Sequence, residues 1–190
     1  MRTMWRCSAL AGLLLVGSSA LWAQHPQVRK GFWIGFGIGY GSLHATCDNC
    51  SDSTVGSVSG RLRLGGTLRP NLLLGGDIVG WSKDEGTLTD YAGGTSAAVY
   101  WYPMETGGFF LKGGAGFSYF SESGGGVASS GTGFGFIVGA GYDVRVGRNI
   151  SITPVGNFLW GSVGDINTPF GTAFGWKQTL LDVGLDVTFH

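Results

Sequence analysis

Hydrophobic and polar positions alternate with a period of two along most of this chain. In the segment Gly31–Ser42, GFWIGFGIGYGS, the even positions carry mainly bulky apolar side chains and the odd positions carry mostly glycine. Successive side chains of a β-strand point to opposite faces, so the pattern predicts a strand with one apolar face and one nearly bare face. The segment Thr179–His190 alternates in the same way, but its second face carries the carboxylates of Asp182 and Asp186.

Six further segments follow the same period less clearly, which brings the number of predicted strands to eight. These segments are 55–68, 72–81, 91–102, 108–120, 133–146 and 149–160. In most of them apolar side chains occupy one face, and small, polar or charged side chains occupy the other. The pattern leaves the two faces of segment 91–102 unassigned.

The connections between the predicted strands alternate in length. Tight links are predicted at 69–71, 103–107 and 147–149. Longer, polar connections rich in Gly, Ser and Asp are predicted at 44–54, 82–90, 121–132 and 161–177. Short turns at one end and long loops at the other are typical of outer-membrane barrels. The sequence therefore predicts an all-β fold, an eight-stranded antiparallel up-and-down transmembrane β-barrel.

The register across the tight links supports this prediction. Pairing Leu68 with Leu72 across the first link places Arg63 opposite Asp77, both on the polar face. The equivalent pairing across 147–149 also keeps the polar faces of both strands on one side. A slip of one residue would turn a whole strand over, so this agreement indicates that the strands are paired correctly.

The polar faces are expected to line the lumen, where they would form a balanced network of charges. The network comprises Arg61, Arg63, Lys112 and Arg145 with Asp77, Asp143, Asp182 and Asp186. Within it, Arg63–Asp77 and Lys112–Asp143 are the expected pairs. Glycine and serine dominate the rest of these faces and leave room for a few long charged side chains.

The apolar faces are expected to contact lipid, because they end in aromatic residues as the girdles of membrane barrels do. The lipid-facing residues of the first and last strands are Phe32, Ile34, Phe36, Ile38, Tyr40, Leu181, Val183, Leu185, Val187 and Phe189. The alternative is a soluble barrel with its apolar faces turned inward. The apolar side chains of eight long strands would overfill so small an interior.

The first 23 residues have the pattern of a secretory signal peptide. Arg2 and Arg6 precede a short apolar run and a small-residue exit that ends at Ala23. The alternative, a membrane anchor, would need about 20 apolar residues. We therefore expect residues 1–23 to be cleaved and residues 24–190 to form the barrel domain. Loss of two arginines leaves 10 basic against 12 acidic residues, a net charge of −2, which does not favour a nucleic-acid partner.

Cys47 and Cys50, in the sequence CDNC, are the thiols that remain after export. The favoured interpretation is a disulfide at the tip of the first long loop, since exported proteins meet an oxidising environment. A zinc site using the nearby His44 would need a further ligand that the sequence does not indicate. A redox-active CxxC would need a helix in a βαβ context, which is not predicted.

No catalytic, cofactor-binding or metal-binding residues are predicted. The glycine run has period two and lacks the phosphate-loop pattern, and the scarce histidines have no obvious nucleophile beside them. Trp33 and Trp81 fall on the same strand faces as the polar side chains and are expected to fill part of the lumen. The remaining mature tryptophans, at 101, 160 and 176, are expected in the interfacial girdle.

Three stretches resemble the small outer-membrane β-barrel superfamily, which includes the OmpA transmembrane domain, OmpX-like proteins and the opacity adhesins. They are GFWIGFGIGYGS, GAGYDVRVGRNISITPVGNFLWG (Gly139–Gly161) and LDVGLDVTF. The resemblance covers the mature chain and implies a monomer in the bacterial outer membrane. It also implies contacts with outer-membrane lipid and with the barrel-insertion machinery, which reads a terminal aromatic. Here Phe189 is penultimate and His190 is last.

The expected function is a structural or surface-interaction role of the adhesion type, carried by the long extracellular loops. The sequence does not identify the extracellular ligand. The first alternative is a narrow channel for small or apolar solutes, although eight strands leave an interior that side chains can fill. The second alternative is an enzyme that modifies lipid A.

Overall fold

The computed structural model describes residues 28–168 and 171–190. The expected signal peptide, residues 1–23, lies outside the described residues. The strands are β1 (Phe32–Thr46), β2 (Ser53–Arg69), β3 (Leu72–Asp84), β4 (Leu88–Trp101), β5 (Phe109–Gly124), β6 (Val127–Tyr142), β7 (Val144–Arg145), β8 (Ile150–Thr168) and β9 (Gly171–Phe189). Within these described ranges, no helix is long and apolar enough to cross a membrane.

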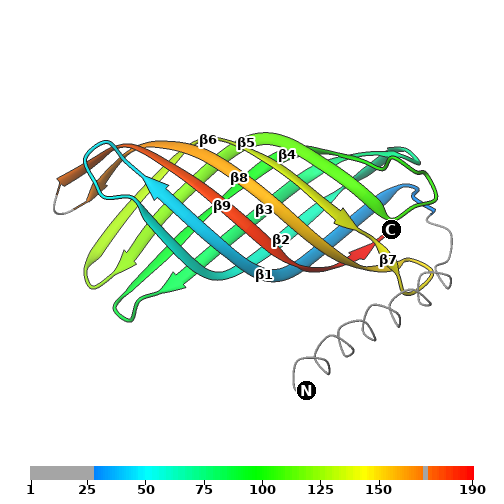
Figure 1. Ribbon diagram of the computed structural model, residues 1–190, viewed down its shortest axis with the longest axis horizontal. Helices are drawn as coiled ribbons and strands as arrows, with labels where there is room; N and C mark the ends of the chain where they lie inside the picture. The colour runs from blue at the N-terminus through cyan, green and yellow to red at the C-terminus, as the bar shows by residue number, and fades with distance from the viewer. Residues whose placement is uncertain (1–27, 169–170) are drawn as a thin grey trace, which may run out of the picture.

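The strands form one closed antiparallel barrel (Figure 1). Each strand from β1 to β5 pairs with the next, β9 pairs with both β1 and β8, and β8 pairs with β6 to close the sheet. The two-residue β7 continues β6 after a break at Asp143, so the barrel has eight long strands. The predicted fold class is confirmed. Closure leaves no sheet edge within the belt, as hydrocarbon requires.

The predicted register is correct in the wall of the barrel. Arg63 lies opposite Asp77 in the ladder between β2 and β3, and Arg145 lies opposite Ser151. A bulge between Thr67 and Arg69 shifts the pairing only at the turn itself.

The expected long loops are largely wrong, because the strands continue through them. The connections are only 47–52, 85–87 and 125–126, together with the link between Thr168 and Gly171. We call the end of the barrel that carries these four hairpins the loop end, and the opposite end, where the chain terminates, the turn end (Figure 1). The polar Ser, Thr and Gly residues of these segments keep their backbone groups paired in ladders, which unpaired loops would not do.

The outer surface carries an apolar belt bounded by aromatic residues. Phe32 and Ile38 expose 63% and 78% of their surface outside the barrel. All ten residues expected to contact lipid lie on this outer face, half-exposed or exposed. The outward aromatics near the loop end are Tyr40, Tyr91, Tyr119, Phe134 and Trp160; those near the turn end are Phe32, Trp101, Phe109, Tyr142 and Phe189.

The structure assigns the faces of β4, which the sequence left open. Ala92, Ala98 and Tyr100 are buried in the interior, whereas Val99 and Trp101 are exposed outside. Both faces carry alanine and an aromatic residue, so hydrophobicity alone does not distinguish them.

The polarity of the wall reverses above the belt. Beyond Tyr40 the outward positions become polar: Ser42, His44, Thr46, Ser82, Asp84, Ser121, Ser123, Ser130 and Thr132. The interior at the same height holds an apolar cluster of Leu43, Val79, Trp81, Ala92, Phe120, Ile137, Leu159, Val163, Ile166 and Leu180. The loop end therefore has the polar outer face and apolar interior of a water-soluble barrel, whereas the belt has the reverse arrangement.

Candidate functional site

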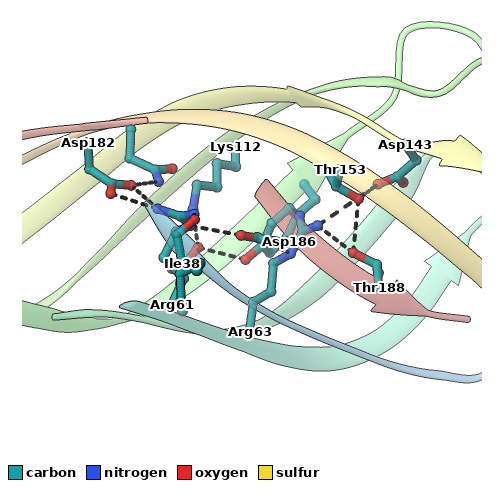
Figure 2. A network of polar contacts seen from close by, with 12 residues as sticks. Ile38, Arg61, Arg63, Lys112, Asp143, Thr153, Asp182, Asp186 and Thr188 are labelled. Atoms are coloured by element: carbon teal, nitrogen blue, oxygen red, sulfur yellow. Dashed lines mark hydrogen bonds and ion pairs between the residues drawn. The ribbon is translucent and has the colours of Figure 1, made fainter. Parts of the chain in front are cut away.

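The middle of the lumen holds a network of buried charges centred on Arg61 (Figure 2). The Arg61 guanidinium donates to both Asp182 oxygens at 2.8 and 2.6 Å, and to Asp186 Oδ1 at 2.9 Å. It also donates to the carbonyl oxygen of Ile38 at 2.7 Å. Asp182 accepts further hydrogen bonds from Asn157 and Ser59. Asp182 thus accepts hydrogen bonds on both oxygens and Asp186 on Oδ1, and buried charges need such partners.

Arg63 extends this network toward the turn end. Its Nη2 donates to Thr188 Oγ1 at 2.6 Å, and its Nε lies 3.3 Å from Asp186 Oδ2. Nη2 also lies 3.9 Å from Asp143 Oδ1. Asp143 accepts a hydrogen bond from Thr153 at 2.7 Å, and the two threonine hydroxyls lie 3.0 Å apart. These contacts connect β2, β8 and β9 with Asp143, at the break between β6 and β7, across the lumen.

The structure places all eight predicted lumen charges in the interior but changes their pairing. Arg63 does not bind Asp77; instead Asp77 binds the ammonium group of Lys112 and accepts a hydrogen bond from Tyr100 at 2.7 Å. The expected pairs Arg63–Asp77 and Lys112–Asp143 are therefore wrong. Arg145 is buried too, but its guanidinium donates to backbone carbonyls, those of Arg148 and Val28.

The glycines of β1 explain this change of partner. Gly35 separates Arg63 from Thr188 in the sheet, and Gly37 separates Arg61 from Asp186. A Cβ at Gly35 would lie 2.8 Å from Nε of Arg63. Because these glycines present no side chain, the arginines of β2 lie across β1 and reach the carboxylates of β9, two strands away. The alternating glycines thus form the floor of the charge network.

At the turn end, Arg29 closes the interior. Its side chain is buried, its Cζ lies 3.4 Å from the centre of the Tyr102 ring, and it donates to the carbonyls of Glu105 and Gly107. It also lies 4.0 Å from Asp143. This role of Arg29 is not predictable from the sequence, because Arg29 precedes the first segment with period-two alternation.

The C-terminal residue lies in the same cluster. The His190 ring has Nε2 3.3 Å from Ser151 Oγ and 3.8 Å from Asp143. Burial lowers the pKa of His190 to about 4, helped by the positive charges of Arg145 and Arg29 and opposed by Asp143. The ring is therefore neutral at physiological pH and completes the turn-end closure without adding a charge.

The tryptophans occupy both the lumen and the belt. Trp33 and Trp81 are buried inside, where Trp33 packs edge-on against Tyr100 at 4.9 Å. Trp101 and Trp160 lie on the outer belt. Trp176 was expected there as well, but it packs against Phe120 in the loop-end interior at 4.6 Å. The reversal of polarity above the belt accounts for this difference.

Cys47 and Cys50 are joined in a disulfide with their Cα atoms 5.4 Å apart. The short loop that they close docks on the edge of β9. Asn49 donates to the carbonyl of Thr172 at 2.9 Å and accepts from the amide of Phe174 at 3.0 Å, as a neighbouring strand would. The loop therefore holds the protruding β8–β9 hairpin against β1 and β2.

The inner face of the loop end carries an acidic row, which we call the mouth: Lys83, Asp90, Glu122 and Ser129. These residues lie directly opposite one another on β3, β4, β5 and β6, one pleat above Phe120. Burial raises the pKa of Asp90, and the charges of Glu122 and Glu85 raise it further. Among the residues that the structure describes, neither Asp90 nor Glu122 has an ion-pair partner.

The described part of the chain holds no group of three or more His, Cys, Asp or Glu residues placed to bind a metal ion. His44 instead shares a hydrogen bond with Thr54 at 2.9 Å.

Comparison with known proteins shows the fold. No protein-family model matches the chain, and no curated protein sequence matches it. Among solved structures, Neisserial surface protein A has a TM-score of 0.54 at 19% identity, over 85% of this chain and 99% of that chain. Ail, the attachment invasion locus protein of Yersinia pestis, has a TM-score of 0.49 at 14% identity, over 84% of this chain and 99% of that chain. The outer membrane protein OprG from Pseudomonas aeruginosa has a TM-score of 0.48 at 11% identity, over 86% of this chain and 98% of that chain. The chain has the fold of the small eight-stranded outer-membrane barrels.

Proposed function

We propose that this protein is an outer-membrane barrel with a surface-interaction role, in which the loop end is the extracellular binding surface and the lumen is closed. The observation that carries the proposal is the reversal of polarity along the barrel. Between the turn end and the outward tyrosines the outer face of the wall is apolar, as contact with lipid requires. Between these tyrosines and the loop end the outer face is polar and the interior is apolar, as contact with water requires. A barrel that extends beyond its apolar belt with a water-facing outer wall has a surface to present outside the cell.

The filled interior favours this role over transport. Aromatic side chains, paired charges and an apolar cluster occupy the turn end, the middle and the loop end of the lumen in turn. Eight strands enclose an interior just wide enough for side chains. A solute would have to displace the Arg61 and Lys112 ion pairs, and a buried charge left without its partner is strongly unfavourable.

The location is tested by cell fractionation and surface labelling. The protein should co-fractionate with the outer membrane and migrate differently on a gel before and after heating. An epitope inserted at Gly86 in the β3–β4 turn should be accessible on intact cells, and the same epitope at 147–149 should not. A soluble periplasmic pool, or the opposite labelling pattern, would reject the proposal.

The closed lumen is tested by conductance in planar bilayers. The purified barrel should give no unitary currents, because the ion pairs and clusters persist without a ligand. Regular unitary currents that change on Arg61→Ala would support the channel instead.

A further inference from the structure

Two like charges face each other in the mouth. Asp90 on β4 and Glu122 on β5 lie directly opposite, half-buried on the inward faces that also carry Ala92 and Phe120. Like charges directly opposite destabilise a sheet, and partial burial reduces the screening of their repulsion. The pKa of Asp90 is raised by burial, by Glu122 and by Glu85 of the β3–β4 turn. A cation between the two carboxylates would relieve this repulsion.

The described residues do not supply that cation. Lys83 on β3 lies on the other side of Asp90, but it forms no ion pair among them. The loop end as a whole carries seven carboxylates against two lysines. The carboxylates are Asp48, Asp52, Asp84, Glu85, Asp90, Glu122 and Asp165; the lysines are Lys83 and Lys177. This excess of negative charge attracts cations from solution.

Ser129 marks a place where a ligand donor is missing. It lies opposite Glu122 on the inward face of β6, which also holds Gly131. Its side chain is 5% exposed, and its hydroxyl has no hydrogen-bond partner among the described residues. Buried hydroxyls are normally hydrogen-bonded. A hydroxyl without a partner therefore lies in one row with two carboxylates without a cation, across β4, β5 and β6.

The apolar cluster beneath the mouth closes the interior. Phe120 lies one pleat below Glu122 on the same strand and packs against Trp176, with the ring centres 4.6 Å apart. Ala92 lies one pleat below Asp90 and is fully buried. A ligand of the mouth therefore approaches from the loop end and does not pass down the lumen. Its charged end meets the carboxylates, and the rest of it lies outward, among the hairpins.

From these observations we propose that the mouth binds a small organic diamine or polyamine. One primary ammonium group lies between Asp90 and Glu122 and donates to Ser129, and the next extends outward to Glu85. An ammonium group has three donors, one for each group of the row. The three strands lie about 4.8 Å apart, so the three side chains converge on one ammonium group centred over Glu122. The proposal rests on the proposed function, because it names a ligand class for the extracellular binding surface.

A metal ion fits the mouth less well than an amine. A hard divalent cation such as Ca²⁺ takes six to eight oxygen ligands around one point. In the ranges that the structure describes, no three or more His, Cys, Asp or Glu residues are placed around one ion. The carboxylates of the loop end are instead spread over several hairpins. Positive charges spread along a flexible chain match that arrangement, and a diamine carries them.

The test uses the full mature chain refolded in detergent at pH 7, with folding checked by heat-modifiable migration. Calorimetric titration measures the binding of 1,4-diaminobutane. Its controls are tetramethylammonium, which carries charge without donors, and butylamine, which lacks the second ammonium group. We expect saturable binding of diaminobutane and at least tenfold weaker binding of tetramethylammonium, because it cannot donate hydrogen bonds to the carboxylates. Butylamine should bind about threefold more weakly, the contribution of one exposed ion pair.

Variants locate the site. Asp90→Asn with Glu122→Gln should weaken diaminobutane at least tenfold, and Ser129→Ala should weaken it about threefold. The double substitution removes a repulsion, so this variant is expected to fold. Asp84→Asn is the matched control and should leave the affinity unchanged, although Asp84 is also an exposed loop-end carboxylate. Lys83→Ala should leave binding unchanged or strengthen it.

Equal affinity for either control amine, an unchanged affinity of the double variant or of Ser129→Ala, or an equal loss in Asp84→Asn would overturn the proposal. Binding that occurs only in Lys83→Ala would also overturn it, because Lys83 would then be the native counter-ion of the pair. Displacement of diaminobutane by equimolar Ca²⁺ at constant ionic strength would overturn it in favour of a metal site. Failure here together with a surface-accessible Gly86 epitope would remove the ligand class and leave the proposed function intact.

Discussion

At the scale of single residues, Arg61 holds the lumen together. It binds both Asp182 and Asp186, and all three side chains are almost fully buried. Arg61→Ala would leave two carboxylates without their main cation, and breaking a buried pair costs about 3–5 kcal/mol. We expect a loss of that order in the free energy of unfolding, measured by urea titration in detergent. Lys83→Ala is the control, since Lys83 forms no ion pair; a loss below about 1 kcal/mol for Arg61→Ala would contradict the network.

The glycines of β1 are predicted to be specific to their positions. A Cβ at Gly37 would collide with the carboxylate of Asp186 and the backbone of Leu185, whereas nothing lies within 4 Å of a Cβ at Gly60 on the outer face of β2. Overpacking of this kind costs about 1–3 kcal/mol. Gly37→Ala should therefore destabilise the barrel in urea titration, and Gly60→Ala should be neutral or slightly stabilising. Equal effects of the two substitutions would show that backbone freedom, not space, selects glycine.

The same residues show what the sequence could and could not predict. The alternation of side chains along a strand predicted that Arg61, Arg63 and Asp186 face the interior, because a strand has only two faces. This alternation does not predict how far a long side chain extends. The contact that Arg63 makes with Asp186, across Gly35 of the intervening strand, was therefore not predicted. Arg29 and the facing pair Asp90–Glu122 were missed for a related reason. Their contacts depend on register across several strands or on a segment with no periodicity.

At the scale of elements, the ionised carboxylate of Asp90 destabilises the hairpins of the loop end in a pH-dependent way. The pKa of Asp90 is raised by burial, by Glu122 and by Glu85. The folded state therefore binds the proton more tightly than the unfolded chain, so ionisation of Asp90 lowers stability as pH rises through its raised pKa. The penalty is fully present above the raised pKa of Asp90 and is absent below the pKa of an ordinary aspartate.

Asp90→Asn removes that penalty and should raise the melting temperature of the refolded barrel at pH 7. The gain should shrink as pH falls through the raised pKa of Asp90 and should be lost at about pH 3, below the ordinary aspartate pKa of 3.8. Circular dichroism melts at the two pH values provide the measurement, and Asp84→Asn provides a control with the same change in charge on an exposed residue. A gain that is equal at both pH values, or equal in the control, would mean that Asp90 is not strained.

The elements also explain why the predicted loops became strands. The segments beyond the belt lose the apolar outer face, and with it the signal that marked them as strands. Their inner positions still carry apolar residues such as Leu43, Phe120 and Leu180. In hindsight, these residues are a period-two signal with the opposite facing.

At the scale of the whole molecule, the barrel consists of two stacked parts with opposite polarity. The membrane boundary should lie at the outward tyrosines, since Tyr40, Tyr91 and Tyr119 separate the lipid-facing from the water-facing positions. Aromatic residues prefer this interface. On β5 the boundary falls between two outward residues, Phe117 and Ser123, which are both exposed.

This boundary can be measured in the refolded protein. A fluorophore attached to cysteine at Phe117→Cys should be quenched by lipids that carry a nitroxide on the acyl chain, and one at Ser123→Cys should be quenched by aqueous iodide instead. The disulfide Cys47–Cys50 is kept oxidised throughout, so each variant has one reactive thiol. Six residues of a tilted strand span about 15–20 Å, enough to pass from hydrocarbon to water. Acyl-chain quenching at both positions would place the hairpins inside the membrane and remove the water-facing upper barrel on which the proposed binding surface depends.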